Sequence, residues 1–173
     1  MNNKEKNTYV REQLLKALLE LIKETSFDRI SVSELVQRAE VGRASFYRNY
    51  CDIKDILVQE AGRLTKEWEK GYEAVPHTEV NEVLITLLDF YKNHQDFFLA
   101  VYASGQPQII LDIILKGFNI LPETPNAVAY IQSSVAYMLY GWILEWIKRG
   151  MQESGTELAR MIAEYHQQKQ PFE

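Results

Sequence analysis

Hydrophobic residues recur at helical spacing near the start of the chain. They stand at every third or fourth position from Val10 to Leu21, and Thr8 precedes them as a residue that can cap a helix. This pattern predicts an amphipathic helix with one apolar stripe. Similar patterns follow as far as about residue 169, and no segment alternates as a strand does. The chain is therefore predicted to be all-α, with about nine helices.

Two short helices around a tight turn are predicted next. Ser33 opens the first of them, because its hydroxyl can accept a backbone hydrogen bond, and the helix runs to Ala39. Residues 40–42 interrupt the pattern before a second run, from Arg43 to Tyr50, that mixes apolar and polar residues. The spacing suits a helix-turn-helix, whereas the local pattern also fits an ordinary αα-hairpin.

The second of these helices has the composition of a DNA-reading element. A partly buried helix can enter the major groove and offer Arg, Ser and Asn to base edges. A Tyr hydroxyl or a Lys ammonium can hold phosphates.

From Thr8 to Leu57 the chain resembles the DNA-binding domain of the TetR/AcrR family of bacterial transcriptional regulators. The resemblance is carried by Leu14, Ala17, Leu18, Leu21, Phe27, Ile30, Val32, Ala39, Val41, Ser45, Phe46, Tyr47 and Tyr50. It implies a DNA-binding domain over residues 1–54, an effector-binding and dimerisation domain over 55–173, and a recognition helix in which Tyr47 contacts a phosphate. The residues expected to contact DNA are Ser33, Gly42, Arg43, Ala44, Ser45, Tyr47, Arg48, Asn49 and Lys54.

The chain departs from the family pattern where DNA would be touched. Glu40 stands where a Gly is common, so a positive φ there would be strained. Ile53 replaces a Lys that usually clamps the DNA backbone, and Lys54 follows one residue later, about 100° around the helix. Cys51 also takes a position where basic residues are frequent. These departures predict a weakened backbone clamp.

The charge of the chain is divided unevenly along the sequence. The net charge is -5, yet residues 1–63 hold 11 Lys and Arg against 10 Asp and Glu, so the acid lies in the second part. Arg38, Arg43 and Arg48 predict a modest positive patch. The overall charge argues against nonspecific coating of nucleic acid.

The stretch from Thr124 to Leu144 has no charged side chain. Gln132 and other polar residues inside it, and Glu145 at its end, argue against a membrane span. A helix that is apolar nearly all round is buried on several sides. With the last helix, it resembles the two helices that form the dimer interface across the TetR/AcrR family. The expected interface residues are Tyr140, Leu144, Ile147, Leu158, Met161, Ile162 and Tyr165.

Aromatic residues of the second domain can line a pocket for a small hydrophobic or aromatic effector, although such residues are often plain core. The expected pocket residues are Trp68, Tyr72, Phe90, Phe98, Tyr102, Tyr137 and Trp142. The sequence also leaves open that this domain responds to a protein partner instead of a small molecule.

No catalytic or metal constellation stands out in the sequence. The three His residues are far apart, and no Gly-rich phosphate loop or metal-ligand spacing is present. We expect no enzyme activity, no cofactor and no metal. With one Cys and no signal pattern at the N-terminus, a cytoplasmic location is expected.

The sequence thus predicts a DNA-binding transcriptional regulator, a repressor that binds a near-palindromic operator as a homodimer and is released by a small effector. The alternative is a protein of the same fold that works mainly through a protein partner and contacts DNA weakly.

Overall fold

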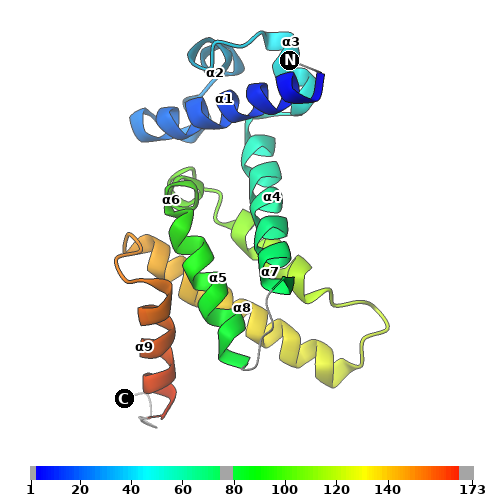
Figure 1. Ribbon diagram of the computed structural model, residues 1–173, viewed down its shortest axis with the longest axis vertical. Coiled ribbons are helices and arrows are strands. Elements are labelled where there is room, and N and C mark those ends of the chain that lie inside the picture. Colours follow the sequence, from blue (N-terminus) through cyan, green and yellow to red (C-terminus); the bar gives the residue numbers. More distant parts are fainter. Residues whose placement is uncertain (1–2, 75–79, 168–173) are drawn as a thin grey trace.

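The computed structural model describes residues 3–74 and 80–167. Over these ranges the chain forms α-helices and one short 3-10 helix at Phe27–Arg29, without a strand (Figure 1). The helices are α1 (Asn3–Glu24), α2 (Val32–Arg38), α3 (Arg43–Asn49), α4 (Ile53–Glu73), α5 (Val80–Asn93), α6 (Gln95–Ala103), α7 (Gln108–Phe118), α8 (Asn126–Lys148) and α9 (Gly155–Gln167). The predicted all-α fold is confirmed.

The first three helices form a small head at one end of the molecule (Figure 1). The apolar stripe of α1 covers α2 and α3, so that Leu14, Leu35 and Phe46 are fully buried together. Two predicted helix starts are wrong. Thr8 lies inside α1, which begins at Asn3, and Ser31 rather than Ser33 caps α2 by accepting from the Glu34 backbone N–H at 3.1 Å.

Helix α4 connects the head to the rest of the molecule, which we call the body (α5–α9). The Asp52 carboxylate caps α4 by accepting from the Asp55 backbone N–H at 2.7 Å. Along its length α4 contacts α1 in the head and α5 and α7 in the body. Its buried residues, among them Ile56, Leu57 and Leu64, spread over both regions. The helix therefore joins the two cores into one.

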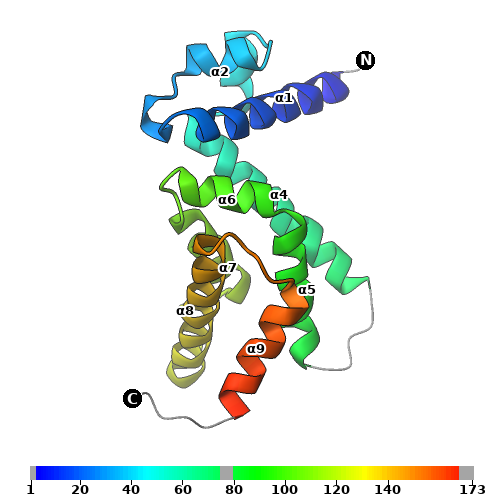
Figure 2. The same ribbon diagram turned by 90° about the vertical axis from the view of Figure 1, so that its left-hand side faces the viewer.

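The body packs its helices around a second part of the same core. Its fully buried side chains include Leu88, Ile110 and Ile143 from α5, α7 and α8. The rings of Tyr91 and Phe98 stack with their centroids 4.1 Å apart, which fixes α5 against α6. Helix α6 lies directly beneath α1 (Figure 2), and the two helices are in contact.

Helix α9 is anchored on α5 at its first residue. A Cβ on Gly155 would lie closer than 3.0 Å to backbone atoms of Leu88 and Asp89, so only Gly permits this approach. Asp89 also accepts from the Thr156 backbone N–H at 3.2 Å. A capping box completes the start, because the Glu157 carboxylate accepts from the Ser154 N–H at 2.8 Å and Ser154 Oγ accepts from the Glu157 N–H.

Helix α8 is the one helix among the described residues long and apolar enough to cross a membrane. Its first half projects beyond the body toward the α7–α8 connection (Figure 1). Its buried residues are Ala136, near the middle of the helix, and Ile143, Trp146 and Ile147 in its second half. Within the subunit, burial of α8 is thus concentrated in its second half, and the burial of its other side against a second subunit stays a prediction.

Candidate functional site

The turn between α2 and α3 is a Schellman motif with an unusual residue. The Val41 N–H donates to the Val36 carbonyl at 3.0 Å and the Glu40 N–H donates to the Gln37 carbonyl at 3.2 Å. Glu40 takes the left-handed position, with φ at 53°, where Gly is usual. Gly42 then caps α3 in an extended conformation, with φ at -72°. The sequence predicted backbone strain at Glu40 if its φ were positive, and its φ is positive in the structure.

Helix α3 presents one polar face to solvent. Phe46 and Tyr50 point into the head core, whereas Tyr47 is 53% exposed. The side chain of Arg43 lies over the Tyr47 ring, with Cζ 5.8 Å from its centroid. The outward face thus carries two guanidinium groups, of Arg43 and Arg48, and one phenol within two helical turns.

The other predicted DNA-contacting residues divide between exposed and half-buried positions. Exposed are Ser33, Gly42, Ala44 and Lys54. Ser45 and Asn49 are half-buried, and the Asn49 amide donates back to the Ser45 carbonyl at 2.8 Å. The amide of Asn49 is therefore engaged within α3 in this structure.

Gln59 of α4 holds the end of α3 in place. Its amide donates to the Asn49 carbonyl at 3.0 Å and to the Asp55 carboxylate at 2.9 Å, while its oxygen accepts from Arg11 of α1 at 2.9 Å. The same Asp55 oxygen accepts from the Cys51 backbone N–H at 3.0 Å. This network, which we call the Gln59 network, was not predicted from the sequence, because its side-chain contacts join α3 and α4 to Arg11 of α1, which is 48 residues from Gln59.

The start of α4 is acidic where the family pattern would place a cation. Ile53 is half-buried against the core, and Lys54 is exposed beside it. Asp52 and Asp55 place two carboxylates in the cap and first turn. Because Asp52 already accepts one free N–H of this helix end and both carboxylates carry negative charge, less positive potential remains for an external phosphate.

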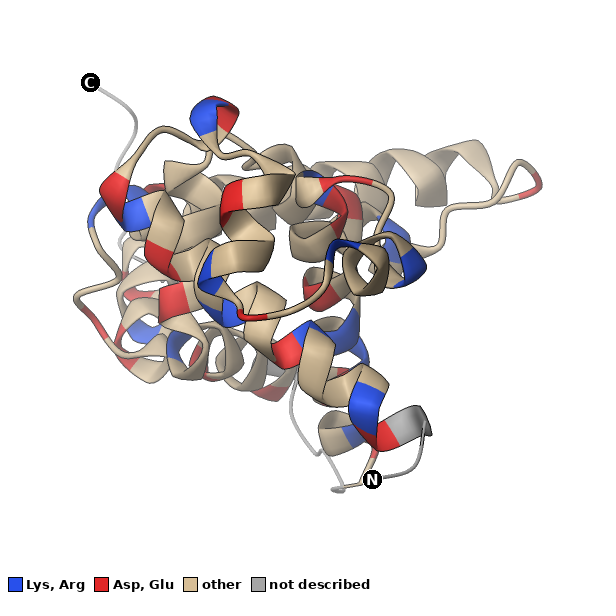
Figure 3. Ribbon diagram, turned by 90° about the horizontal axis from the view of Figure 1, so that it is seen from above, with Lys and Arg blue, Asp and Glu red and all other residues tan. Residues whose placement is uncertain are grey.

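Arg38 does not add to the surface of α3. Its guanidinium forms a two-pronged ion pair with Glu24 of α1, at 2.7 and 2.8 Å, and lies 3.9 Å from Glu20. The hydrogen bond from Arg38 lowers the pKa of the Glu24 carboxyl, and the same bond raises the pKa of Arg38. The positive patch expected from Arg38, Arg43 and Arg48 is thus reduced to the last two. Seen from above the head, basic and acidic residues are interspersed (Figure 3).

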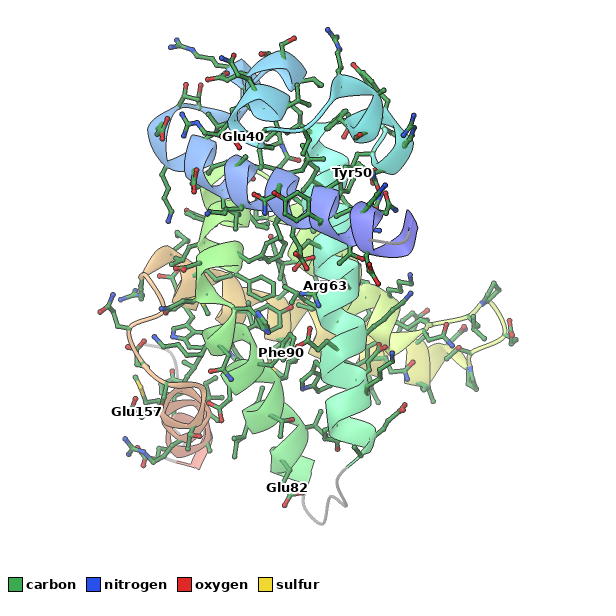
Figure 4. All side chains as sticks on the ribbon, turned by 45° about the horizontal axis from the view of Figure 1, so that its top comes forward. Glu40, Tyr50, Arg63, Glu82, Phe90 and Glu157 are labelled. Atoms are coloured by element: carbon green, nitrogen blue, oxygen red, sulfur yellow. The ribbon has the colours of Figure 1, made fainter. Side chains whose placement is uncertain are left out.

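A cavity of about 320 Å³, which we call the body cavity, lies between α4 and the helices of the body. Phe90 lies in it, between α5 and α4 (Figure 4). Of the pocket residues predicted from the sequence, Trp68, Phe90 and Phe98 line the cavity. Tyr72, Tyr102, Tyr137 and Trp142 are not among its lining residues, and Tyr137 is 53% exposed.

Half of the remaining residues that line this cavity are aliphatic. The other lining residues are Thr65, Glu69, Val83, Leu87, Tyr91, Ile113, Ile114, Gly117, Phe118 and Leu139. Aliphatic residues at helical spacing carry no sequence signal that separates a cavity wall from packed core. Only the arrangement of α4, α5, α7 and α8 identifies them.

Exposed apolar side chains gather on α8 and α9. On α8 they are Val128, Tyr130, Ile131, Val135, Tyr137 and Met138, and on α9 they are Met161 and Tyr165. Of the residues predicted for a dimer interface, Met161 and Tyr165 are exposed, and Tyr140, Leu144, Leu158 and Ile162 are half-buried. Ile147 is only 1% exposed and belongs to the core of the subunit, because α8 turns that face toward α6 and α7.

Metal-binding groups are absent from the described residues, which hold no cluster of three or more His, Cys, Asp and Glu side chains suited to an ion.

Comparison with protein families gives two matches that follow the head and the body. Residues 14–59 match the family described as bacterial regulatory proteins, tetR family. Residues 78–168 match the family described as transcriptional regulator C-terminal region. A search among curated proteins found no similar sequence.

Solved structures with the same fold include three that cover nearly all of the chain. Lin0861 from Listeria innocua is 16% identical, with a TM-score of 0.78, over 98% of this chain and 96% of that one. A protein of Syntrophomonas wolfei assigned to the TetR-family transcriptional regulators is 19% identical, with a TM-score of 0.63, over 96% and 95%. The regulator FadR from Bacillus subtilis, solved in complex with stearoyl-CoA, is 14% identical, with a TM-score of 0.56, over 88% and 95%.

Proposed function

Because this chain belongs to the TetR family of bacterial transcriptional regulators, we propose that it is a repressor that binds a near-palindromic operator as a homodimer. One observation carries the proposal: the exposed face of α3, where Arg43, Tyr47 and Arg48 project from a helix otherwise fixed in the head. In the proposed complex α3 enters the major groove, where a guanidinium can bind guanine through two hydrogen bonds. Tyr47 holds a phosphate and sets the register.

The proposed dimer forms through α8 and α9. Monomeric proteins rarely expose large contiguous apolar surface, and the exposed residues of α8 include Tyr130 at 69% and Ile131 at 65%. A second copy related by a twofold axis would cover them. Two α3 helices could then meet successive major grooves about 34 to 36 Å apart. Action on the bacterial chromosome places the protein in the cytoplasm.

The proposed effector is a small hydrophobic or aromatic molecule in the cavity of the body. The related FadR structure binds stearoyl-CoA, which supports a ligand-responsive domain in this fold. Among the described residues, those that line the cavity include neither Lys nor Arg nor His, so they offer no side-chain cation for CoA phosphates. A smaller, less charged effector suits these walls better. The proposed role is thus binding and release of DNA, without catalysis or a cofactor.

Mobility shift with random fragments of the source genome tests the operator. We expect a few fragments to be retained far more tightly than the rest, with an affinity that falls steeply as salt rises. Within the selected operator, Arg43→Ala should relax base preference, whereas Tyr47→Phe should weaken binding on all sequences alike. Uniform, weak retention of every fragment would contradict the operator proposal. A monomer mass by light scattering at micromolar concentration would contradict the dimer.

The second candidate is a regulator of the same fold that acts mainly through a protein partner. The acidic start of α4 favours it, because Asp52 and Asp55 repel phosphates where a Lys clamp would attract them. The variant Asp52→Asn separates the two candidates, since Asn caps a helix as well as Asp does. Tighter operator binding by Asp52→Asn, with unchanged thermal stability, supports DNA as the working partner. If wild type and variant both bind operator no better than random DNA, the protein partner is favoured.

A further inference from the structure

The ring of Tyr47 is placed to control how Arg43 reads DNA. On the basis of the proposed operator binding, we infer that Tyr47 is a positioning residue for Arg43. Its ring holds the guanidinium in one orientation and so sets the base preference of α3, in addition to the contact of its hydroxyl with a phosphate.

The Tyr47 ring is held by the core of the head. The neighbouring Phe46 is fully buried, and its ring meets that of Tyr47 edge-on, with the centroids 5.1 Å apart. This edge-to-face arrangement is one that aromatic pairs prefer. Tyr47 is nevertheless 53% exposed. A ring that is fixed by the core therefore reaches the outward surface of α3.

The guanidinium of Arg43 rests on this ring. Arg43 stands four residues before Tyr47, which places the two side chains on the same face of α3. The Arg43 Cζ lies 5.8 Å from the centroid of the ring, within the range of a cation–π contact. The Arg43 Nη2 lies 3.5 Å from the Tyr47 Oη, at the long limit of a hydrogen bond that Arg43 donates. Both contacts restrict the orientation of the same guanidinium.

The contact with the ring leaves the reading groups of Arg43 available. The ring attracts the guanidinium through its positive charge, whereas guanine is bound by two N–H groups on one edge. Arg has five N–H donors, so a bond to the Tyr47 hydroxyl leaves enough for guanine. The hydroxyl accepts that bond, and its own hydrogen stays available for a phosphate. The pair can therefore contact a base and a phosphate at once.

A fixed orientation strengthens base preference at both the right and the wrong base. At guanine, a guanidinium that is already ordered loses less freedom on binding. At a wrong base, it cannot swing away to a phosphate, so the mismatch is fully felt. Arg48 is the internal comparison, because it is the other exposed guanidinium of α3 and makes no ring contact among the described residues.

Single-base substitutions of the selected operator, measured by fluorescence anisotropy, test the role of the ring. The position at which Arg43→Ala loses discrimination defines the base of Arg43, and Arg48→Ala defines that of Arg48. Tyr47→Leu removes the ring and should lower discrimination at the Arg43 base about threefold, while discrimination at every other base stays unchanged. Tyr47→Phe keeps the ring, so it should weaken binding overall but retain the discrimination of the wild type.

NMR of the free protein tests the geometry without DNA. The Hε and δ-methylene protons of Arg43 should show a ring-current shift in the wild type and in Tyr47→Phe. This shift should be lost in Tyr47→Leu. Thermal unfolding of each variant verifies that it folds.

The outcomes separate the role of the ring from the proposed function. The role is overturned if Tyr47→Leu keeps full discrimination at the Arg43 base, if its loss is equal at all bases, or if Tyr47→Phe loses as much. It is also overturned if Arg43→Ala loses discrimination at no base, or if the Arg43 protons show no ring-current shift. Where the wild type still prefers one operator in these cases, the proposed function stands. If the wild type prefers no operator over random DNA, the proposed function fails, and the role of Tyr47 in base preference fails with it.

Discussion

The left-handed Glu40 in the turn between α2 and α3 offers a test that separates backbone strain from charge. Three substitutions suffice. Glu40→Gly removes both the strain and the charge, Glu40→Asn removes the charge and places a residue that tolerates positive φ, and Glu40→Gln removes only the charge. The Schellman hydrogen bonds of this turn are made by backbone groups, so all three variants keep them.

The expected gain in stability follows from the backbone conformation. A left-handed conformation costs a residue with a Cβ roughly 1 to 2 kcal/mol, and Gly gives back about 0.5 to 1 kcal/mol through its freer unfolded state. Glu40→Gly should thus stabilise the head by about 0.5 to 1 kcal/mol. For a chain of this length 1 kcal/mol corresponds to about 2 to 4 °C in Tm. Glu40→Asn should behave similarly, and Glu40→Gln should leave Tm within about 1 °C of the wild type.

The expected gain in DNA affinity follows from the charge instead. Glu40 is exposed next to Gly42 and the start of α3, so its carboxylate would lie near the phosphate backbone in the proposed complex. All three variants remove this repulsion and should bind operator about two- to threefold more tightly at low salt, an advantage that shrinks above about 0.5 M salt as the Debye length falls.

Thermal unfolding and fluorescence anisotropy with a labelled operator measure the two effects. The reasoning is refuted if Glu40→Gln raises Tm as much as Glu40→Gly, because the strain would then play no part. It is equally refuted if Glu40→Gly lowers Tm, since the turn would then depend on a contact of the Glu40 side chain.

Three further predictions concern the body, the Gln59 network and acid stability. Gly155→Ala should lower the free energy of unfolding by about 2 to 3 kcal/mol in denaturant, because the added Cβ meets the backbone of Asp89. Gly117→Ala is the control and should not destabilise the protein, because no atom lies within 4 Å of its Cβ. Equal effects of the two variants would contradict the close approach at Gly155. Gln59→Leu should weaken operator binding about tenfold while Tm changes little, and unchanged affinity would show that α3 needs no such support. The hydrogen bonds that Glu157 accepts lower its pKa below the ordinary 4.5, so the stability that Glu157 contributes is present above pH 4.5 and lost as the pH falls through the lowered pKa. Glu157→Gln should therefore show a smaller loss of Tm than the wild type over that pH range. Identical pH profiles of the two proteins would contradict this role of Glu157.

The helices and the turn of the head could be predicted well because they depend on residues that are close together in the sequence. The spacing of apolar residues in α1 and the turn at 40–42 both follow from short-range rules, and the strained Glu40 was expected because a Gly is usual at that position. Helix starts were less predictable. Both Ser31 and Ser33 can cap a helix, and the choice of Ser31 depends on how Ile30 and Leu35 enter the core.

The body could be predicted less well because its important features are tertiary. Ile147 and Met161 look alike in sequence, yet one is core and the other is exposed. Trp68 and Trp142 are equally plausible pocket residues until α4, α5 and α7 are placed around a cavity that only Trp68 lines. The Gln59 network belongs to the same class, since its donors and acceptors come from three helices.

The Gln59 network also couples the end of α3 to α4, so that we expect the two to move together. Trp68 at the cavity and Ile53 at the top of α4 lie about 22 Å apart along the helix axis, at 1.5 Å per residue. A tilt of about 5° about the cavity end thus carries the attached end of α3 sideways by about 2 Å, which exceeds the tolerance of a hydrogen bond to a base edge. A tilt of this size at the cavity end of α4 would therefore move the head out of register with the proposed operator.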